Sequence, residues 1–163
     1  SDGRDIPNVM EYWADMYPDR AENVDVFGRL YDWSAAMDSV RGLAVNANGH
    51  TQGICPQGWY LPLSSQYLQL STHGTNALRV ANYWINDTGG NNSSGFSALP
   101  AGFFNGLSNQ YENLMGETRF WSTSNPVNTA VSSCINFHFP CSDVRTTSSP
   151  NFNGYSIRCI LEE

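Results

Sequence analysis

The feature that most constrains the fold of this chain is a change of pattern near its middle. Apolar residues recur at helical spacing in the first half, which ends in the Gly-, Asn- and Ser-rich segment Asp87–Ser94. From Gly95 onward the signals are short strands and turns, and the alternation of Ile135, Phe137 and Phe139 is the clearest of them. Because helices precede strands instead of alternating with them, the sequence predicts an α+β fold.

The same patterns place the individual elements. An extended run is expected over 24–31. Ser64 is expected to cap the helix that runs through Leu70. Helices are predicted over 8–16, 34–37, 64–70 and about 76–85. Strands are predicted over 96–100, 101–104, 119–122, 135–139 and 155–161.

Length and charge narrow the possible functions. A chain of 163 residues is expected to form a single domain over 1–163. Charged residues make up only 14%, the net charge is −7, and all eight basic residues are Arg. We therefore expect no nucleic-acid partner and no attraction to anionic membranes. No stretch approaches the roughly 18 apolar residues of a membrane span, so we expect no direct membrane insertion.

Several sequence blocks carry a family resemblance. They are Phe27–Met37, Cys55–Pro62, Gly95–Gly102, Phe120–Thr123 and Gly154–Cys159. In this order they resemble the Fibrobacter succinogenes major paralogous domain, which is common in surface proteins of Bacteroidetes. The resemblance spans about 24–161 and implies a C-type lectin-like fold, with two main helices packed on a twisted, mostly antiparallel sheet. Residues 1–23 are then expected to form an N-terminal extension with a helix.

The stretch from Ser122 to Ile160 has an unusual composition. It contains no Lys, Gln, Glu, Met or Trp, and every residue type in it is encoded by some codon that ends in cytosine. This resembles the variable region of proteins diversified by retroelements, which lies at the C-terminal end of a C-type lectin fold. The alternative is that a segment of strands and loops simply avoids long charged side chains.

Such a variable region separates core residues from contact residues. Ile135, Phe137 and Phe139 are expected to pack inside, while Asn136 and His138 face solvent. The loops 124–129 and 140–153 are expected to complete a surface rich in Ser, Asn and aromatic residues, like that of an antibody, with Arg145 and Phe152 as its anchors. The predicted ligand-binding positions are Asn125, Pro126, Val127, Asn128, Asn136, His138, Pro140, Asp143, Arg145, Thr147, Ser149, Asn151 and Phe152.

Four cysteines allow three pairings. Cys55 and Cys159 lie in the family blocks beside apolar residues, so we favour a disulfide or close packing between them; two inert buried thiols are the alternative. Cys134 and Cys141 would face opposite sides of one straight strand, and a bridge between them needs a bend such as Pro140 would supply. Either bridge would indicate an oxidising compartment.

The sequence holds no recognisable catalytic or metal motif. His50, His73 and His138 stand apart from one another, and no Gly-x-Ser-x-Gly or His-Glu-x-x-His pattern occurs. The segment Trp84–Asp87 departs from the calcium motif of sugar-binding lectins because Ile85 interrupts it. We therefore predict no catalytic residue, no bound metal and no cofactor.

Together these observations favour a non-catalytic ligand-binding domain for receptor recognition or adhesion. Its retroelement-diversified surface would bind a protein or glycan on another cell or surface, and its carrier would be a bacterial cell surface or a phage particle. Two alternatives remain open: a fixed-specificity surface or pilus-tip adhesin of the same family, and an enzyme of the formylglycine-generating type, to whose reactive Cys pair no motif here corresponds.

Overall fold

The computed structural model describes residues 25–38, 45–87, 89–123, 131–138 and 144–163. Its helical elements are α3 (Trp33–Ala36), α4 (Ser64–Ser71), α5 (Gly74–Leu78) and the short 3-10 helix η1 (Ile85–Asp87). Its strands are β1 (Trp59–Tyr60), β2 (Phe103–Asn105), β3 (Gln110–Glu112), β4 (Glu117–Ser122), β5 (Val131–His138), β6 (Val144–Pro150) and β7 (Ile160–Leu161). The strands form three antiparallel groups, β1-β7, β2-β3 and β4-β5-β6, so the fold is α+β.

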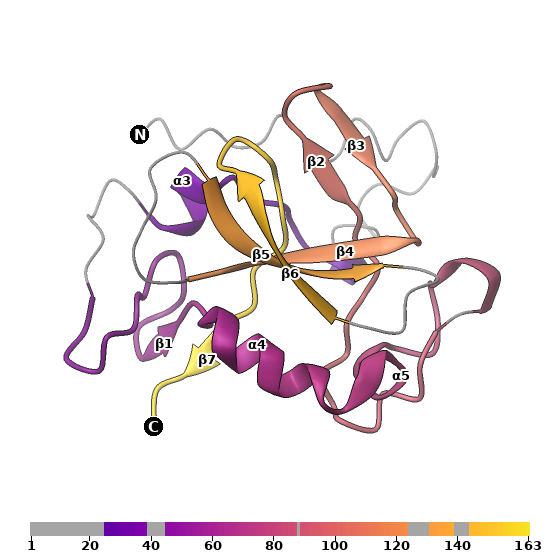
Figure 1. Ribbon diagram of the computed structural model, residues 1–163, viewed down its shortest axis with the longest axis horizontal. Coiled ribbons are helices and arrows are strands. Elements are labelled where there is room, and N and C mark those ends of the chain that lie inside the picture. The colour runs from indigo at the N-terminus through magenta and orange to yellow at the C-terminus, as the bar shows by residue number, and fades with distance from the viewer. Residues whose placement is uncertain (1–24, 39–44, 88, 124–130, 139–143) are drawn as a thin grey trace.

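Strand β4 lies at the centre of the molecule (Figure 1). One of its edges pairs with β5. At its other edge, Trp121 N donates to Ser156 O at 3.1 Å, and Ser156 N donates to Arg119 O at 2.9 Å. The neighbouring Tyr155 exchanges two backbone hydrogen bonds with Tyr31, of 2.8 and 2.9 Å. The C-terminal segment therefore lies between β4 and the early part of the chain.

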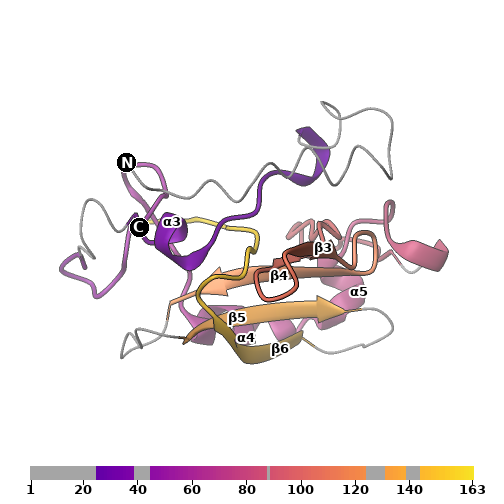
Figure 2. The ribbon, with the colours of Figure 1, turned by 90° about the horizontal axis from the view of Figure 1, so that it is seen from above.

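Both faces of β4 are covered, because its apolar side chains point alternately to two clusters. Phe120 packs with Tyr67, Leu78, Trp84, Ala98, Phe137 and Val144, in the layer between the three-stranded sheet and helices α4 and α5 (Figures 1 and 2). Trp121 points the other way and packs with Trp33, Ala36, Met37, Cys55, Leu61, Phe103 and Tyr155. A central strand buried on both faces makes a rigid frame for the strands at the outer edge.

Helix α4 is fastened directly to β4. Ser64 N donates to Thr123 O at 3.0 Å, and the hydroxyls of Ser64 and Ser122 are 2.9 Å apart. Ser64 is thus the first helical residue and not the cap. Leu63 occupies the cap position, and its N–H donates to the side-chain oxygen of Gln66 at 2.8 Å.

The expected helix over 76–85 is wrong in most of its length. Helix α5 ends at Leu78, because Arg79 is extended and forms a bridge with Ala98. Tyr83 has a φ of 74°, which a helix does not accommodate. Trp84 reaches the core from this irregular backbone, and its indole N–H donates to Ala98 O at 3.2 Å. The apolar residues that suggested a helix are therefore buried without forming one.

Of two other expectations for the first half, one is wrong in part and one is confirmed. Residues 25–27 are helical, so the run over 24–31 is not uniformly extended. The helix over 34–37 is present as α3, where Asp32 caps the helix by accepting from Ala35 N at 2.7 Å. The N-terminal extension over 1–23 and its helix over 8–16 lie outside the described residues.

The C-terminus is attached to the first half by a covalent bond and a strand pair. Cys55 and Cys159, the favoured pair, form a disulfide, and β7 pairs with β1 beside it. Cys141 and the side chain of Cys134 are outside the described part of the chain. Among the helices that the structure describes, none combines the length and the apolar character that crossing a bilayer requires.

Candidate functional site

The three-stranded sheet carries one cross-strand row of polar side chains. Arg119 of β4, Asn136 of β5 and Arg145 of β6 lie opposite one another in register, so they share one face. Phe120 and Phe137 lie in the rows on either side of this one, and both point to the other face, toward α4. This row of polar side chains therefore lies on the face away from α4, the face to which Trp121 also points.

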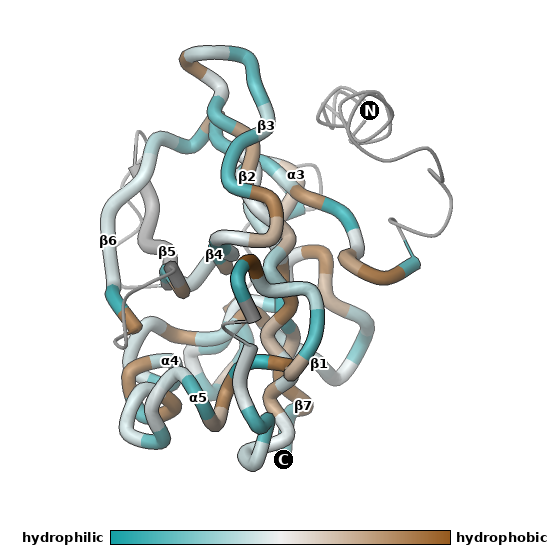
Figure 3. The backbone as a smooth tube through the Cα atoms, turned by 90° about the vertical axis from the view of Figure 1, so that its right-hand side faces the viewer, coloured by the Kyte–Doolittle hydropathy of each residue, from teal (hydrophilic) through white to brown (hydrophobic). Residues whose placement is uncertain are grey.

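Strand β6 is the outer strand of this sheet. Its ends are buried, since Val144 is 9% exposed and Ser149 is 3% exposed, while the four residues between them, 145–148, are exposed. Figure 3 shows the strand along one side of the molecule, in pale and teal colours over most of its length. The expected loop over 140–153 is wrong here, because 144–150 is a strand. Residues 145–148 form what we call the β6 surface.

Asn136 differs from the expected solvent-facing residue. Its side chain is half-buried, and its Oδ1 is buried without a hydrogen-bond partner among the described residues. The following residue, Phe137, is fully buried, as the alternation predicts. Asn136 therefore lies at the boundary between the core and the β6 surface. A buried carbonyl oxygen without a donor is costly, so this position favours a partner that donates a hydrogen bond.

Ser149 and Asn151 are less available than expected. Inside the protein, the Ser149 hydroxyl is hydrogen-bonded to the Tyr155 hydroxyl. It also accepts a hydrogen bond from Asn153 Nδ2 at 3.0 Å. Asn151 is half-buried, and its carbonyl accepts from Trp33 N at 3.0 Å. These contacts join the end of β6 to the core. We therefore take Ser149 out of the ligand-binding surface as a correction.

Phe152 lies exposed, 55% of its surface being accessible, at the turn between β2 and β3. Its ring and carbonyl lie directly against Gly106, where a Cβ would come within 2.6 Å of the ring. Gly106 N also donates to Asn153 Oδ1 at 3.0 Å, and the neighbouring Leu107 is 86% exposed. The turn of this hairpin thus lies beside Phe152, which reasoning from 122–160 alone did not include.

Most of the remaining predicted contact positions lie outside the described part of the structure. Thr147 is an exposed member of the β6 surface, and His138 lies on β5 opposite Glu117, but its side chain is not described. The positions outside the described residues are Asn125, Pro126, Val127, Asn128, Pro140 and Asp143.

A partly buried ion pair joins Glu117 and Arg119 on β4. Glu117 is 1% exposed, accepts from Arg119 Nε and also accepts from Asn113 Nδ2 at 2.7 Å. Burial lowers the pKa of Arg119, but the hydrogen bond and the charge of Glu117 outweigh it and raise that pKa overall. The guanidinium lies 3.8 Å from the centre of the Phe103 ring. Since its partners hold it in place, Arg119 supports the surface from inside.

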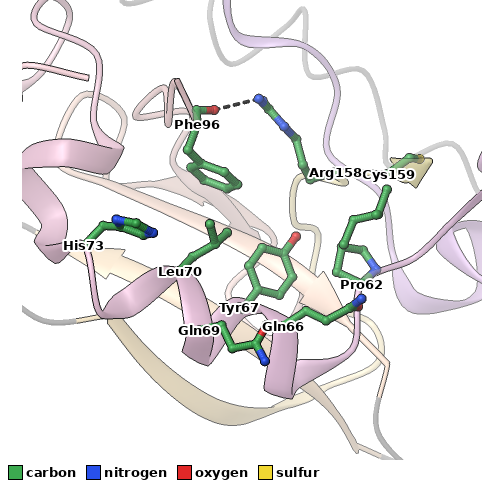
Figure 4. A pocket seen from close by; sticks show the side chains of 10 residues that line it. Pro62, Gln66, Tyr67, Gln69, Leu70, His73, Phe96, Arg158 and Cys159 are labelled. Carbon is green, nitrogen blue, oxygen red and sulfur yellow. Dashed lines mark hydrogen bonds between the residues drawn. The ribbon is translucent and has the colours of Figure 1, made fainter. Parts of the chain in front are cut away.

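A cavity of about 470 Å³ opens on the opposite side of the sheet, beside α4 (Figure 4). Its lining comes from the helix, from the loop around Phe96 and from the C-terminal segment: Pro62, Gln66, Tyr67, Gln69, Leu70, His73, Phe96, Arg158, Cys159 and Ile160. Its volume falls within the usual range for small-molecule sites. Sequence reasoning missed it because its walls are far apart in the chain and share no motif.

The described residues offer no metal centre: no group of three or more His, Cys, Asp or Glu side chains gathers within them. The cysteines of the described core are Cys55 and Cys159, and both are held in the disulfide.

Comparison with known proteins places the chain in a family. No curated protein and no solved structure matches it. The model of the Fibrobacter succinogenes major domain matches residues 1–161, and so also takes in the first 23 residues, which the recognised blocks do not cover. The chain therefore belongs to the Fibrobacter succinogenes major domain family.

Proposed function

We propose that this chain is a non-catalytic ligand-binding domain with a C-type lectin-like fold, used in receptor recognition or adhesion. Its recognition surface comprises the β6 surface, the neighbouring Asn136 and the exposed Phe152. Its partner is a protein or a glycan on another cell or on a particle, and its carrier is a bacterial surface or a phage.

The observation that carries this proposal is the contrast between the β6 surface and its support. Residues 145–148 are exposed on an outer strand, whereas β4 is buried on both faces. Side chains on such a strand change without disturbing the core, and loss of a surface side chain away from special features costs little stability. This is the arrangement that a binding surface with variable specificity requires.

We further propose that a retroelement diversifies the stretch from Ser122 to Ile160. The structure then limits where variation is tolerated, because the stretch also contains residues with core duties. Tyr155 is fully buried, and the side-chain amide of Asn153 donates hydrogen bonds to the hydroxyls of Tyr155 and Ser149. Diversified versions of this stretch should therefore differ in sequence at 145–148 and at Phe152. Ser149, Asn153 and Tyr155 should be unchanged in them.

The locus provides the test. We would sequence the DNA around the codons for Ser122 to Cys159 and search for a near-repeat beside a reverse-transcriptase gene. A near-repeat that differs mainly at template adenines, with changes concentrated at exposed positions, would establish diversification. If no repeat is present, diversification is refuted and a fixed-specificity adhesin remains. If differences fall equally on buried and exposed codons, the assignment of the surface is wrong.

A further inference from the structure

The cavity beside α4 combines an apolar wall with hydrogen-bond donors. The rings of Pro62, Tyr67 and Phe96 and the side chains of Leu70 and Ile160 form most of the wall. The polar groups are Gln66, Gln69, His73 and Arg158, and no acidic residue is among those that line it. The charged side chain of the lining is therefore a cation, although the chain as a whole has a net charge of −7.

Tyr67 is the most informative residue of the cavity. Its side chain is 1% exposed, and its hydroxyl has no hydrogen-bond partner among the described residues. In Figure 4 this hydroxyl points away from α4, toward Arg158. Burial raises the pKa of Tyr67 well above its usual value, so the group remains a neutral donor. A buried hydroxyl without a partner is unfavourable, and an acceptor atom close to it would relieve that cost.

Arg158 supplies the charge. One of its N–H groups donates to Phe96 O at 2.6 Å, and its guanidinium lies 4.9 Å from the centre of the Phe96 ring. These contacts fix the guanidinium at the rim of the cavity. A guanidinium has five N–H donors and no acceptor, so donors remain for an anionic group.

We propose that this cavity binds a small carboxylic acid with an apolar body, in a site separate from the β6 surface. The carboxylate lies between Arg158 and the Tyr67 hydroxyl, and the apolar body lies against Leu70, Phe96 and Pro62. The site is independent of the proposed recognition function, because none of residues 145–148, nor Asn136 or Phe152, is among the residues that line the cavity.

The test compares an acid with its neutral amide. Calorimetric titration of the intact domain with 3-phenylpropanoate should show binding on the order of millimolar or tighter. Binding of 3-phenylpropanamide should be at least about tenfold weaker, because the amide lacks the charge that Arg158 recognises. Equal affinity for the two probes, or no heat from either, overturns the proposal. This comparison needs no variant, so it holds even where a substitution prevents folding.

Variants then assign the residues. Arg158→Gln should weaken binding of the acid about fivefold or more and leave binding of the amide unchanged. Arg29→Gln is the matched control, since it removes an exposed Arg that does not line the cavity and should change neither affinity. An equal loss in both variants means that the acid responds to the overall charge of the protein, which refutes the site.

Tyr67→Phe separates the hydroxyl from the ring. In the free protein this change should leave Tm unchanged or raise it, because it removes a buried polar group without a partner. It should also weaken binding of 3-phenylpropanoate about threefold or more. A lower Tm in the free protein means that the hydroxyl is already satisfied there, and it refutes the role of Tyr67 as an anchor for the carboxylate.

Discussion

Removal of the Cys55–Cys159 disulfide should take away a large part of the stability of the domain. The bond joins residues 104 positions apart, and a loop of about this length is worth about 4.7 kcal/mol of unfolded-state entropy at 25 °C. Measured losses for native disulfides in small domains are about 2–5 kcal/mol, against a total stability of about 5–15 kcal/mol. Cys55 is buried, so Ala is a better replacement than Ser, which would place a hydroxyl in the core.

The assay is urea unfolding of the wild type and of the Cys55→Ala/Cys159→Ala variant, followed by tryptophan fluorescence. We expect the free energy of unfolding to fall by about 3–5 kcal/mol. Reductant should reproduce this loss in the wild type and should not affect the variant. A further loss in the variant would instead reveal the Cys134–Cys141 bridge. A difference below about 1 kcal/mol between oxidised wild type and variant would refute the loop-entropy reasoning.

Three further predictions follow from the packing. Phe137→Ala removes a fully buried ring between Phe96 and Phe120, so urea unfolding should show a loss of about 3–5 kcal/mol. Thr147→Ala, on the β6 surface, should stay within about 0.5 kcal/mol of wild type in the same assay, and a larger loss would contradict the assignment of 145–148 to a tolerant surface. Hydrogen bonds from Asn48 and His50 lower the pKa of Glu162 below its ordinary 4.5, so the stabilisation that Glu162 provides is present above that pH and is lost as the pH falls through the folded-state pKa. Acidification should therefore lower Tm less in Glu162→Gln than in the wild type. Equal falls in Tm would contradict the stabilising role of these hydrogen bonds.

The sequence predicts best those elements whose packing follows a simple period. Phe137 lies in β5 as the alternation of that strand requires, and Tyr67 lies on the buried side of α4. The change from helices to strands along the chain was enough to predict the α+β class. Helix boundaries were less certain, because Trp84 satisfies a helical spacing while its backbone follows contacts with Ala98.

The candidate sites were harder to predict, for two physical reasons. Strand β6 was missed because residues 145–148 are all polar and all exposed, so no apolar alternation marks the strand. Ser149 was placed on the surface because a serine in a polar run gives no sign that Tyr155 covers it. The cavity depends on α4 meeting Phe96 and Arg158, which only tertiary structure brings together.

The position of the segment around Ser156, between β4 and Tyr31, has a consequence for biosynthesis. The central strand cannot complete its hydrogen bonds at that edge until residues 154–156 have left the ribosome, and β1 must wait still longer for β7. Contacts between residues so far apart in sequence give a high contact order, which slows folding. The nascent chain should therefore remain protease-sensitive until nearly all of residues 25–161 are outside the exit tunnel, and then fold in one late step.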